Sequence, residues 1–208
     1  MVSSVRNLKR LIYLISPNKI YPNFYKDLEK VLSSNKVSFF QLRLKKKPKN
    51  LIIKIAKKIK KITKRNKVKF IINDDSKLAK KIGADGCHIG QFDNTVSSAR
   101  KDIKKKTIGV TCHNSKELAL KATKDKADYL AFGSFFESKL KPNAKKADLK
   151  ILFWAKKNIK KPIVVIGGIT DKNYKKLIKA GANYIAISTF IWNNPFLKPL
   201  IAIKKFIK

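Results

Sequence analysis

The stretch VSFFQLRLK at residues 37–45 sets Gln41, Arg43 and Lys45 at every second position of an otherwise apolar run. Alternate residues of a β-strand point to the same side of a sheet, so this spacing predicts a strand on which the three polar side chains converge. An amide, a guanidinium and an ammonium group are costly to hold beside an apolar strand unless an anion meets them. The stretch therefore predicts the end of a strand that binds a phosphorylated ligand.

Two further apolar runs end in polar groups of a similar kind. They are FIIND at 70–74 and GQFD at 90–93, and they place Asn73, Asp74 and Asp93 after strand-like segments. Carboxylates together with ligand phosphates are groups that hold a divalent cation. Asp74 and Asp93 are therefore the expected metal ligands.

Strand-like and helix-like segments alternate along the whole chain. The expected strands are 11–16, 37–44, 68–73, 85–89, 107–111, 128–133, 162–166 and 183–188. The expected helices are 23–34, 49–65, 75–82, 95–104, 115–125, 147–159 and 171–180, and 195–207 follows the last strand. Short apolar runs without clean alternation are typical of strands covered on both faces.

Eight such units predict an α/β protein that forms a single compact (β/α)8 TIM barrel. The alternative is a doubly wound open sheet, but the series has no break and no early GxGxxG. No linker or low-complexity insert divides the chain, so residues 1–208 are expected to form one domain. Chemistry in such barrels lies at the carboxyl ends of the strands, where the unusual polar groups of this sequence gather.

The chain is strongly basic. Lys and Arg number 50 against 13 Asp and Glu, and the formal net charge is +37. Such a charge attracts nucleic acid, acidic lipid or phosphorylated metabolites. The lysines are nevertheless spread along the chain, and in residues 50–65 they occupy faces left by isoleucines at helical spacing. Since there is no helix-turn-helix, zinc-finger or aromatic RNA-binding signature, a solvated basic surface is favoured over a nucleic-acid site.

Cys87 and Cys112 are the two cysteines of the sequence, and both lie in strand-like runs. Without a paired framework, they are expected to be reduced thiols of a cytoplasmic protein. No apolar stretch approaches the ~20 residues that a membrane helix needs, and the run within residues 1–16 is too short for a signal peptide. The sequence therefore predicts a cytoplasmic protein with no membrane partner, and it leaves assembly into a homo-oligomer open.

Seven segments in order give the chain a resemblance to the thiamine-phosphate synthase family over nearly its whole length. They are FQLRLK at 40–45, FIINDD at 70–75, GADGCHIGQFD at 83–93, IGVTCHN at 108–114, ADYLAFGSFF at 127–136, PIVVIGGIT at 162–170 and GANYIAIS at 181–188. The resemblance implies a TIM barrel and a magnesium-dependent transferase. That transferase joins hydroxymethylpyrimidine diphosphate to hydroxyethylthiazole phosphate, plain or carboxylated, and releases thiamine phosphate and pyrophosphate.

The resemblance also implies roles for single residues. Gln41, Arg43 and Lys45 match the family's Q-x-R-x-K, which grips the diphosphate. Asp74 and Asp93 match the carboxylates that bind Mg²⁺. These five residues are the most specific part of the match.

Further substrate-binding residues follow from the same resemblance. Asn73 stands beside the metal carboxylate, and Thr111 replaces the usual Ser while keeping its hydroxyl. Lys141 matches a lysine that faces the diphosphate. Gly168, Ile187 and Ser188 match positions that hold the thiazole phosphate through backbone amides, as barrels commonly do after strands seven and eight.

Diphosphate is a good leaving group only when its developing charge is neutralised. Mg²⁺ with Arg43, Lys45 and Lys141 would neutralise it, which makes these three cations the expected catalytic residues. In the family the pyrimidine is thought to ionise toward a stabilised cation that the thiazole nitrogen captures. No protein nucleophile is then required.

The match is weakest after the sixth strand. The family's T-x-T-K reads SKLK at 138–141, so that Ser138 keeps one hydroxyl while Leu140 replaces the second. Glu137 stands where the family has Pro, and Phe92 stands where it carries an acidic residue. The departures around residue 140 concern the thiazole phosphate more than the metal or the diphosphate.

For some of these residues a purely structural role is the alternative to ligand binding. Asp74 and Asp93 both precede expected helices, and Asp is a favoured N-cap. Asp75 is the better placed cap of the first helix, whereas cap and ligand are equally weighted for Asp93 from the residues alone. His88 lies in a buried strand and is expected to be a core histidine with satisfied hydrogen bonds.

Three other functions are alternatives to the synthase. A thiazole tautomerase of the same fold would use His113 as acid or base, but it needs no magnesium diphosphate site. A non-enzymatic nucleic-acid-binding protein would show binding that weakens steeply with salt and persists when Asp74 is mutated. A barrel that binds phosphorylated ligands without turnover is suggested by Leu140. The Q-x-R-x-K triplet, with Asp74, Asp93 and Lys141, favours the synthase.

Overall fold

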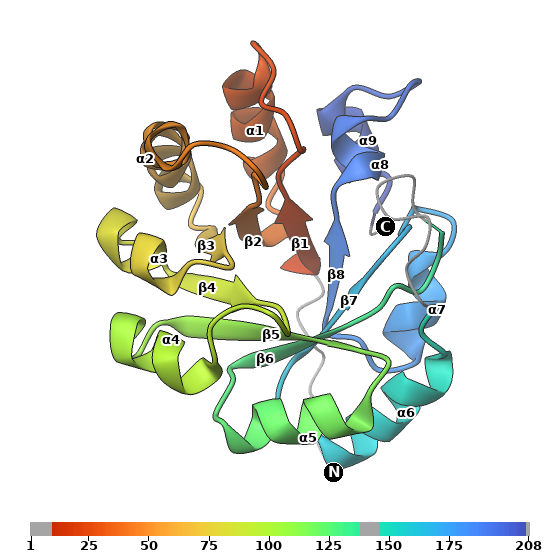
Figure 1. Cartoon of the computed structure of the whole chain (residues 1–208). Coiled ribbons are helices and arrows are strands. Elements are labelled where there is room, and N and C mark those ends of the chain that lie inside the picture. The colour runs from red at the N-terminus through yellow and green to blue at the C-terminus, as the bar shows by residue number, and fades with distance from the viewer. Residues whose placement is uncertain (1–9, 138–145, 207–208) are drawn as a thin grey trace.

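The computed structural model describes residues 10–137 and 146–206. Eight parallel strands form a closed barrel in chain order, and β8 returns to pair with β1 (Figure 1). The strands are β1 (Ile12–Ile15), β2 (Val37–Leu42), β3 (Lys69–Asn73), β4 (Gly86–Ile89), β5 (Thr107–His113), β6 (Tyr129–Phe132), β7 (Ile163–Ile166) and β8 (Tyr184–Ile187). The prediction of a (β/α)8 TIM barrel is confirmed.

Helices surround the barrel on its outside (Figure 1). They are α1 (Phe24–Leu32), α2 (Lys49–Arg65), α3 (Ser76–Ile82), α4 (Val96–Ile103), α5 (Lys116–Lys124), α6 (Leu149–Asn158) and α7 (Tyr174–Lys179), followed by α8 (Thr189–Trp192) and α9 (Pro199–Lys204). Among these helices none combines the length and the apolar character needed to cross a bilayer.

The expected helix 195–207 is wrong at its start, and the short α8 was not predicted. The side chain of Asn194 explains the start, because its Oδ1 accepts hydrogen bonds from the backbone N of Phe196 and Leu197 at 3.0 and 3.1 Å. This turn precedes α9, which begins at Pro199. Proline is favoured at the first position of a helix.

Two apolar layers stabilise the fold. The barrel interior is filled by Tyr13, Ile15, Phe39, Ile71, Tyr129, Ala131, Val164 and Ala186. A larger layer lies between the barrel and the helices, and α2 shows how the sequence forms it. Ile55, Ile59 and Ile62 are buried there, while the lysines of the same helix lie mostly on its exposed side. The predicted amphipathic pattern of residues 49–65 is confirmed.

Candidate active site

The carboxyl ends of β2 and β3 bring two amides into contact. Gln41 is buried in β2, with 3% of its surface exposed, and its Nε2 donates to Asn73 Oδ1 at 2.6 Å. Asn73 is the last residue of β3. The bond uses one donor of Gln41 and one acceptor of Asn73, so both amides keep further groups for a ligand.

The prediction of a strand over 37–44 is wrong at its end, because β2 stops two residues earlier. Arg43 and Lys45 therefore lie in the following loop and are not aligned by strand alternation. The buried hydroxyl of Ser16 forms hydrogen bonds with the backbone of Arg43 where the strand pairing ends. Arg43 N donates to Ser16 Oγ at 2.9 Å, and Ser16 Oγ donates to Arg43 O at 3.3 Å. Both cations remain near the rim, with Lys45 Nζ 3.7 Å from Asp74 Oδ2.

Asp74 and Asp93 form a pair of carboxyl groups. Asp74 N donates to His88 O at 2.7 Å, which holds the turn after β3 with a φ of 65° at Asp74. Asp93 Oδ2 accepts from Gly90 N at 2.6 Å, and its carboxyl lies within hydrogen-bonding reach of Asp74. Burial, followed by the neighbouring Asp93, raises the pKa of Asp74 to about 6, and nearby cations oppose this rise. The pair therefore crowds negative charge where a cation would relieve it.

The helices after these two acids are capped by other residues. Asp75 caps α3 by accepting from Leu78 N at 2.7 Å, as expected. Thr95 caps α4 by accepting from Ser98 N at 3.1 Å. The cap alternative for Asp93 is thus wrong, and both carboxyl groups stay at the rim.

Thr111 lies on β5 at the end of a chain of hydrogen bonds. This chain was not predicted from the sequence. His88 Nε2 lies 2.8 Å from Thr111 Oγ1, and His88 Nδ1 lies 2.9 Å from Tyr129 Oη. Tyr129 Oη in turn lies 2.8 Å from Tyr13 Oη. The expectation that His88 is a histidine with satisfied hydrogen bonds is confirmed. The available signal for the rest was the presence of one tyrosine in each of two otherwise apolar strands, β1 and β6.

The rim after β7 and β8 is formed by backbone in unusual conformations. Gly167 and Gly168 have φ values of 107° and 58°. A Cβ on Gly168 would lie 2.2 Å from Glu137 O, so only glycine fits there. Ile187 is buried at the end of β8, and Ser188 follows it directly. The three predicted thiazole-phosphate residues Gly168, Ile187 and Ser188 therefore lie at the ends of neighbouring strands.

Ser16 joins the two sides of the rim. Its backbone O accepts from Ser188 Oγ at 3.1 Å, while its hydroxyl exchanges the two hydrogen bonds with Arg43 described above. The serine is 2% exposed. A single buried residue after β1 thus connects the predicted diphosphate side to the predicted thiazole-phosphate side.

Two predicted site residues, Ser138 and Lys141, lie outside the described residues. His113 is exposed at the end of β5 with a φ of 51°, next to the rim. Gln91 Nε2 donates to Thr111 O, which ties the loop after β4 to β5. Phe92 in the same loop is fully exposed.

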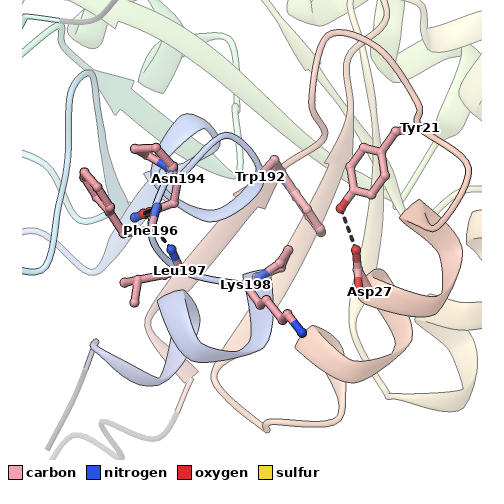
Figure 2. Close-up of a pocket in the computed structure, with 9 residues that line it drawn as sticks. Tyr21, Asp27, Trp192, Asn194, Phe196, Leu197 and Lys198 are labelled. Carbon is pink, nitrogen blue, oxygen red and sulfur yellow. Dashed lines mark hydrogen bonds between the residues drawn. The ribbon is translucent and has the colours of Figure 1, made fainter.

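A cavity of about 330 Å³ lies elsewhere, between α1 and the segment that joins α8 to α9. Figure 2 shows Tyr21, whose hydroxyl donates to Asp27 Oδ2 at 2.9 Å, facing Trp192 and the turn at Asn194. None of the site residues predicted from the sequence lines this cavity. The rim, with its carboxyl pair, amides and cations, is therefore the candidate active site.

The fold and the rim together define a class of protein. A (β/α)8 barrel that presents paired carboxyl groups, cations and amides at the carboxyl ends of its strands has the architecture of a TIM-barrel enzyme.

Comparison with known proteins is consistent with this class. The model of the family described as thiamine monophosphate synthase matches residues 12–191, and the chain belongs to that family. The thiamine-phosphate synthase of Pelagibacter ubique is 58% identical over 95% of this chain and 96% of its own length. That of Erythrobacter litoralis is 39% identical over 88% of both chains.

Solved structures with the same fold superpose on this chain. Thiamine phosphate pyrophosphorylase from Pyrococcus furiosus superposes with a TM-score of 0.84 at 26% identity, covering 95% of this chain and 94% of its own. A 3-hexulose-6-phosphate synthase superposes with a TM-score of 0.65 at 18% identity, covering 93% and 97%. The second similarity concerns the fold alone.

Proposed function

We propose that this chain joins hydroxymethylpyrimidine diphosphate to hydroxyethylthiazole phosphate and releases thiamine phosphate and pyrophosphate. Its family and its identity with curated thiamine-phosphate synthases support a transferase of this kind. The observation that carries the proposal is the ion pair of Lys45 with Asp74, whose carboxyl also neighbours that of Asp93, beside the bonded amides of Gln41 and Asn73. This arrangement supplies metal ligands, a cation for phosphate oxygens and polar groups for a ring.

The carboxyl pair fits Mg²⁺. Asp74 and Asp93 offer hard oxygen ligands, and burial together with the neighbouring Asp93 raises the pKa of Asp74, a rise that a bound divalent cation would oppose. Within the part of the chain that the structure describes, no group of three or more His, Cys, Asp or Glu residues gathers around a metal position. Phosphate oxygens of the substrate and water would therefore complete the ligand set. Bound Mg²⁺ would neutralise charge on the diphosphate.

The cations Arg43 and Lys45 would act on the leaving group. In the reaction the bond between the pyrimidine methylene carbon and the diphosphate oxygen breaks, and its electron pair goes to the diphosphate. The thiazole nitrogen then donates its lone pair to the same carbon. Fixed positive charges stabilise the diphosphate as its charge develops. Lys141 is proposed to add a third charge, from the family resemblance.

The other residues would orient the two substrates. We assign Gln41, Asn73 and Thr111 to the pyrimidine substrate, because they face the same rim as the carboxyl pair. Gly168, Ile187, Ser188 and, by resemblance, Ser138 are assigned to the thiazole phosphate. Backbone amides of tight turns are common anion ligands, which suits the positive φ of Gly168.

The same proposal covers the cellular setting. Buried, unpaired Cys87 and Cys112 suit a reducing compartment, and we place the enzyme in the cytoplasm. Its partners are two small phosphorylated substrates, and assembly into a homo-oligomer is compatible with the proposal. The charge of +37 is assigned to a solvated surface.

Two alternatives remain as outcomes of the test. A thiazole tautomerase would depend on His113, which is exposed at the rim, and would not need the carboxyl pair. A nucleic-acid-binding protein would bind through its lysines and lose affinity steeply with salt.

The test is a coupling assay with purified protein, both phosphorylated substrates and Mg²⁺. Thiamine phosphate is detected by its fluorescent oxidation product, and the assay is repeated with EDTA and then with excess Mg²⁺. We expect product that disappears with EDTA and returns with Mg²⁺. Absence of product from protein that is folded by circular dichroism would overturn the proposal. Product that persists in EDTA would overturn the magnesium assignment alone.

A further inference from the structure

Four hydrogen-bonded side chains cross the barrel from β1 to β5. Tyr13 Oη lies 2.8 Å from Tyr129 Oη, Tyr129 Oη lies 2.9 Å from His88 Nδ1, and His88 Nε2 lies 2.8 Å from Thr111 Oγ1. Tyr13 and Tyr129 are 2% and 3% exposed, whereas His88 and Thr111 are partly exposed. The chain therefore connects a residue of the candidate site to the closed interior of the barrel.

The buried end of the chain fixes the direction in which protons are donated. Within residues 10–137 and 146–206, the one hydrogen-bond partner of Tyr13 Oη is the hydroxyl of Tyr129. If Tyr129 donated to Tyr13, the proton of Tyr13 would be buried without an acceptor, which is costly. Tyr13 therefore donates to Tyr129, and Tyr129 donates to Nδ1 of His88.

The same direction then fixes the tautomer of the histidine. Because Nδ1 accepts, the single proton of the neutral imidazole lies on Nε2, which donates to Thr111 Oγ1. One acceptor lone pair of Thr111 Oγ1 is then used by His88, and the hydroxyl proton points away from His88.

We propose that Tyr129 and His88 are positioning residues that hold the Thr111 hydroxyl as a hydrogen-bond donor toward the substrate. The inference rests on the proposed function, which makes Thr111 a contact of the pyrimidine substrate. A hydroxyl proton that points away from His88 pairs with an acceptor such as a ring nitrogen. The chain of hydroxyls and imidazole thus sets which edge of the pyrimidine faces β5.

The packing around Tyr129 supports a dedicated position for its ring. A Cβ on Gly109 would lie 1.9 Å from Cζ of Tyr129, so glycine at this point of β5 makes room for the tyrosine. The rings of His88 and Tyr129 stack with centroids 5.6 Å apart and planes 18° apart. The stacking holds the imidazole in the orientation that reaches Thr111.

The first experiment reads the tautomer directly. Protein labelled with ¹⁵N histidine contains two imidazoles, and the His113→Gln variant assigns their signals. In the wild-type protein at pH 7 we expect His88 as a single neutral tautomer with its proton on Nε2. In Tyr129→Phe the donor to Nδ1 is lost, so we expect a mixture of the two tautomers. A wild-type proton on Nδ1, or an unchanged tautomer in Tyr129→Phe, would overturn the proposal.

Two conservative variants serve as controls for the loss of a buried hydroxyl. Tyr13→Phe removes the hydroxyl one step farther from the site, and Tyr129 must still donate to His88, so the Nε2 tautomer is expected to persist. Tyr184→Phe changes another tyrosine of the barrel interior that lies outside the chain. A mixed tautomer in either control would contradict the role assigned to Tyr129.

The second experiment is a double-mutant cycle on the synthase reaction. We expect Thr111→Val to lower kcat/KM by about tenfold and Tyr129→Phe to lower it by about threefold, the range of one hydrogen bond. Adding Tyr129→Phe to Thr111→Val should then lower kcat/KM no further. Additive losses would mean that Tyr129 acts on the fold and not through Thr111.

The two experiments separate this inference from the proposed function. If folded wild-type protein makes no thiamine phosphate, the proposed function fails, while the tautomer measurement still decides the direction of the chain. If the enzyme is active but the cycle is additive, the positioning role fails alone. His88→Gln adds a rescue, because an amide can accept from Tyr129 and donate to Thr111, and it should retain more activity than His88→Leu.

Discussion

The two sides of the rim present candidate ligands of different kinds. After β2, β3 and β4 the candidate ligands are charged or amide side chains, and they contact one another: Gln41 bonds to Asn73, and Lys45 lies 3.7 Å from Asp74. After β7 and β8 the candidate ligands are backbone groups of Gly168, Ile187 and Ser188, and Gly168 lies at positive φ. In the proposed function one side recognises an anion by charge, and the other recognises it by the shape of the main chain.

This difference has a consequence for mutation. Side-chain ligands can be neutralised without changing the backbone, so their loss should affect chemistry and leave folding intact. Backbone ligands can be altered only by forcing a new conformation, so their loss should affect both binding and stability. Substitutions on each side of the rim test that contrast.

The largest effect is expected for Asp74→Asn. The variant keeps the shape of the side chain and removes a proposed metal ligand, so synthase activity at millimolar Mg²⁺ should fall by ~100-fold or more. Asp75→Asn is the matched control, because Asp75 caps α3 and Asn is an equally good cap. Activity of Asp74→Asn equal to that of the control would refute the metal assignment.

Arg43→Ala comes next. Loss of a charge facing the diphosphate should raise its KM and lower kcat, with a combined loss in kcat/KM of about 10- to 100-fold. The KM for thiazole phosphate should hardly change. Arg65→Ala removes an arginine paired with Glu29 on the surface and is the control. Unchanged kinetics in Arg43→Ala would remove that residue from the site.

Gly168→Ala tests the backbone side. At a φ of 58° and with Glu137 O only 2.2 Å from the new Cβ, the turn must shift. We expect the KM for thiazole phosphate to rise about tenfold and stability to fall by about 1–2 kcal/mol. Titration of each substrate at saturating levels of the other, with thermal unfolding, measures both.

Gly83→Ala is the control for this prediction. Gly83 ends α3 with a φ of 67°, and its new Cβ would meet only the flexible end of Lys60. It should lose stability by a similar or smaller amount and leave both KM values unchanged. If both glycine variants alter the thiazole KM, the effect reflects general destabilisation and not a phosphate site.

The same contrast explains what could be predicted from the sequence. The barrel was predictable because short apolar runs recur eight times, and the rim was predictable because Gln41, Asn73, Asp74 and Asp93 are polar residues at the ends of such runs. The exact end of β2 was not, because Ser16 sets it from 27 residues away through the hydrogen bonds to Arg43.

The chain of hydrogen bonds inside the barrel also could not be predicted from the sequence. Tyr13 and Tyr129 are 116 residues apart, and each alone resembles an ordinary core aromatic. Their contact depends on barrel closure and on the space that Gly109 leaves for the ring of Tyr129. Pairing of this kind follows from three-dimensional packing and carries no local pattern.

The smallest effect is expected for the stability of Asp74→Asn in the absence of metal. This variant should gain stability although it loses activity. The carboxyl of Asp74 has its pKa raised from 3.8 to about 6 in the folded protein. Below pH 3.8 it is protonated in both states and favours the folded one. As the pH rises from 3.8 to about 6, the unfolded chain gives up its proton first, and this contribution is lost.

In EDTA at pH 7.5, Asp74→Asn should therefore be more stable than the wild type. We expect the free energy of unfolding to rise by about 1 kcal/mol, since the Asp74 side chain is 31% exposed and solvent reduces both the cost of burying its charge and its repulsion from Asp93. Denaturant unfolding at pH 7.5 and at pH 4 measures it, and the advantage should shrink at the lower pH. Saturating Mg²⁺ should stabilise the wild type more than the variant, because only the wild type keeps both carboxylates. A variant less stable than the wild type in EDTA at pH 7.5 would show that Asp74 supports the fold, and the contrast between the two sides of the rim would then not hold.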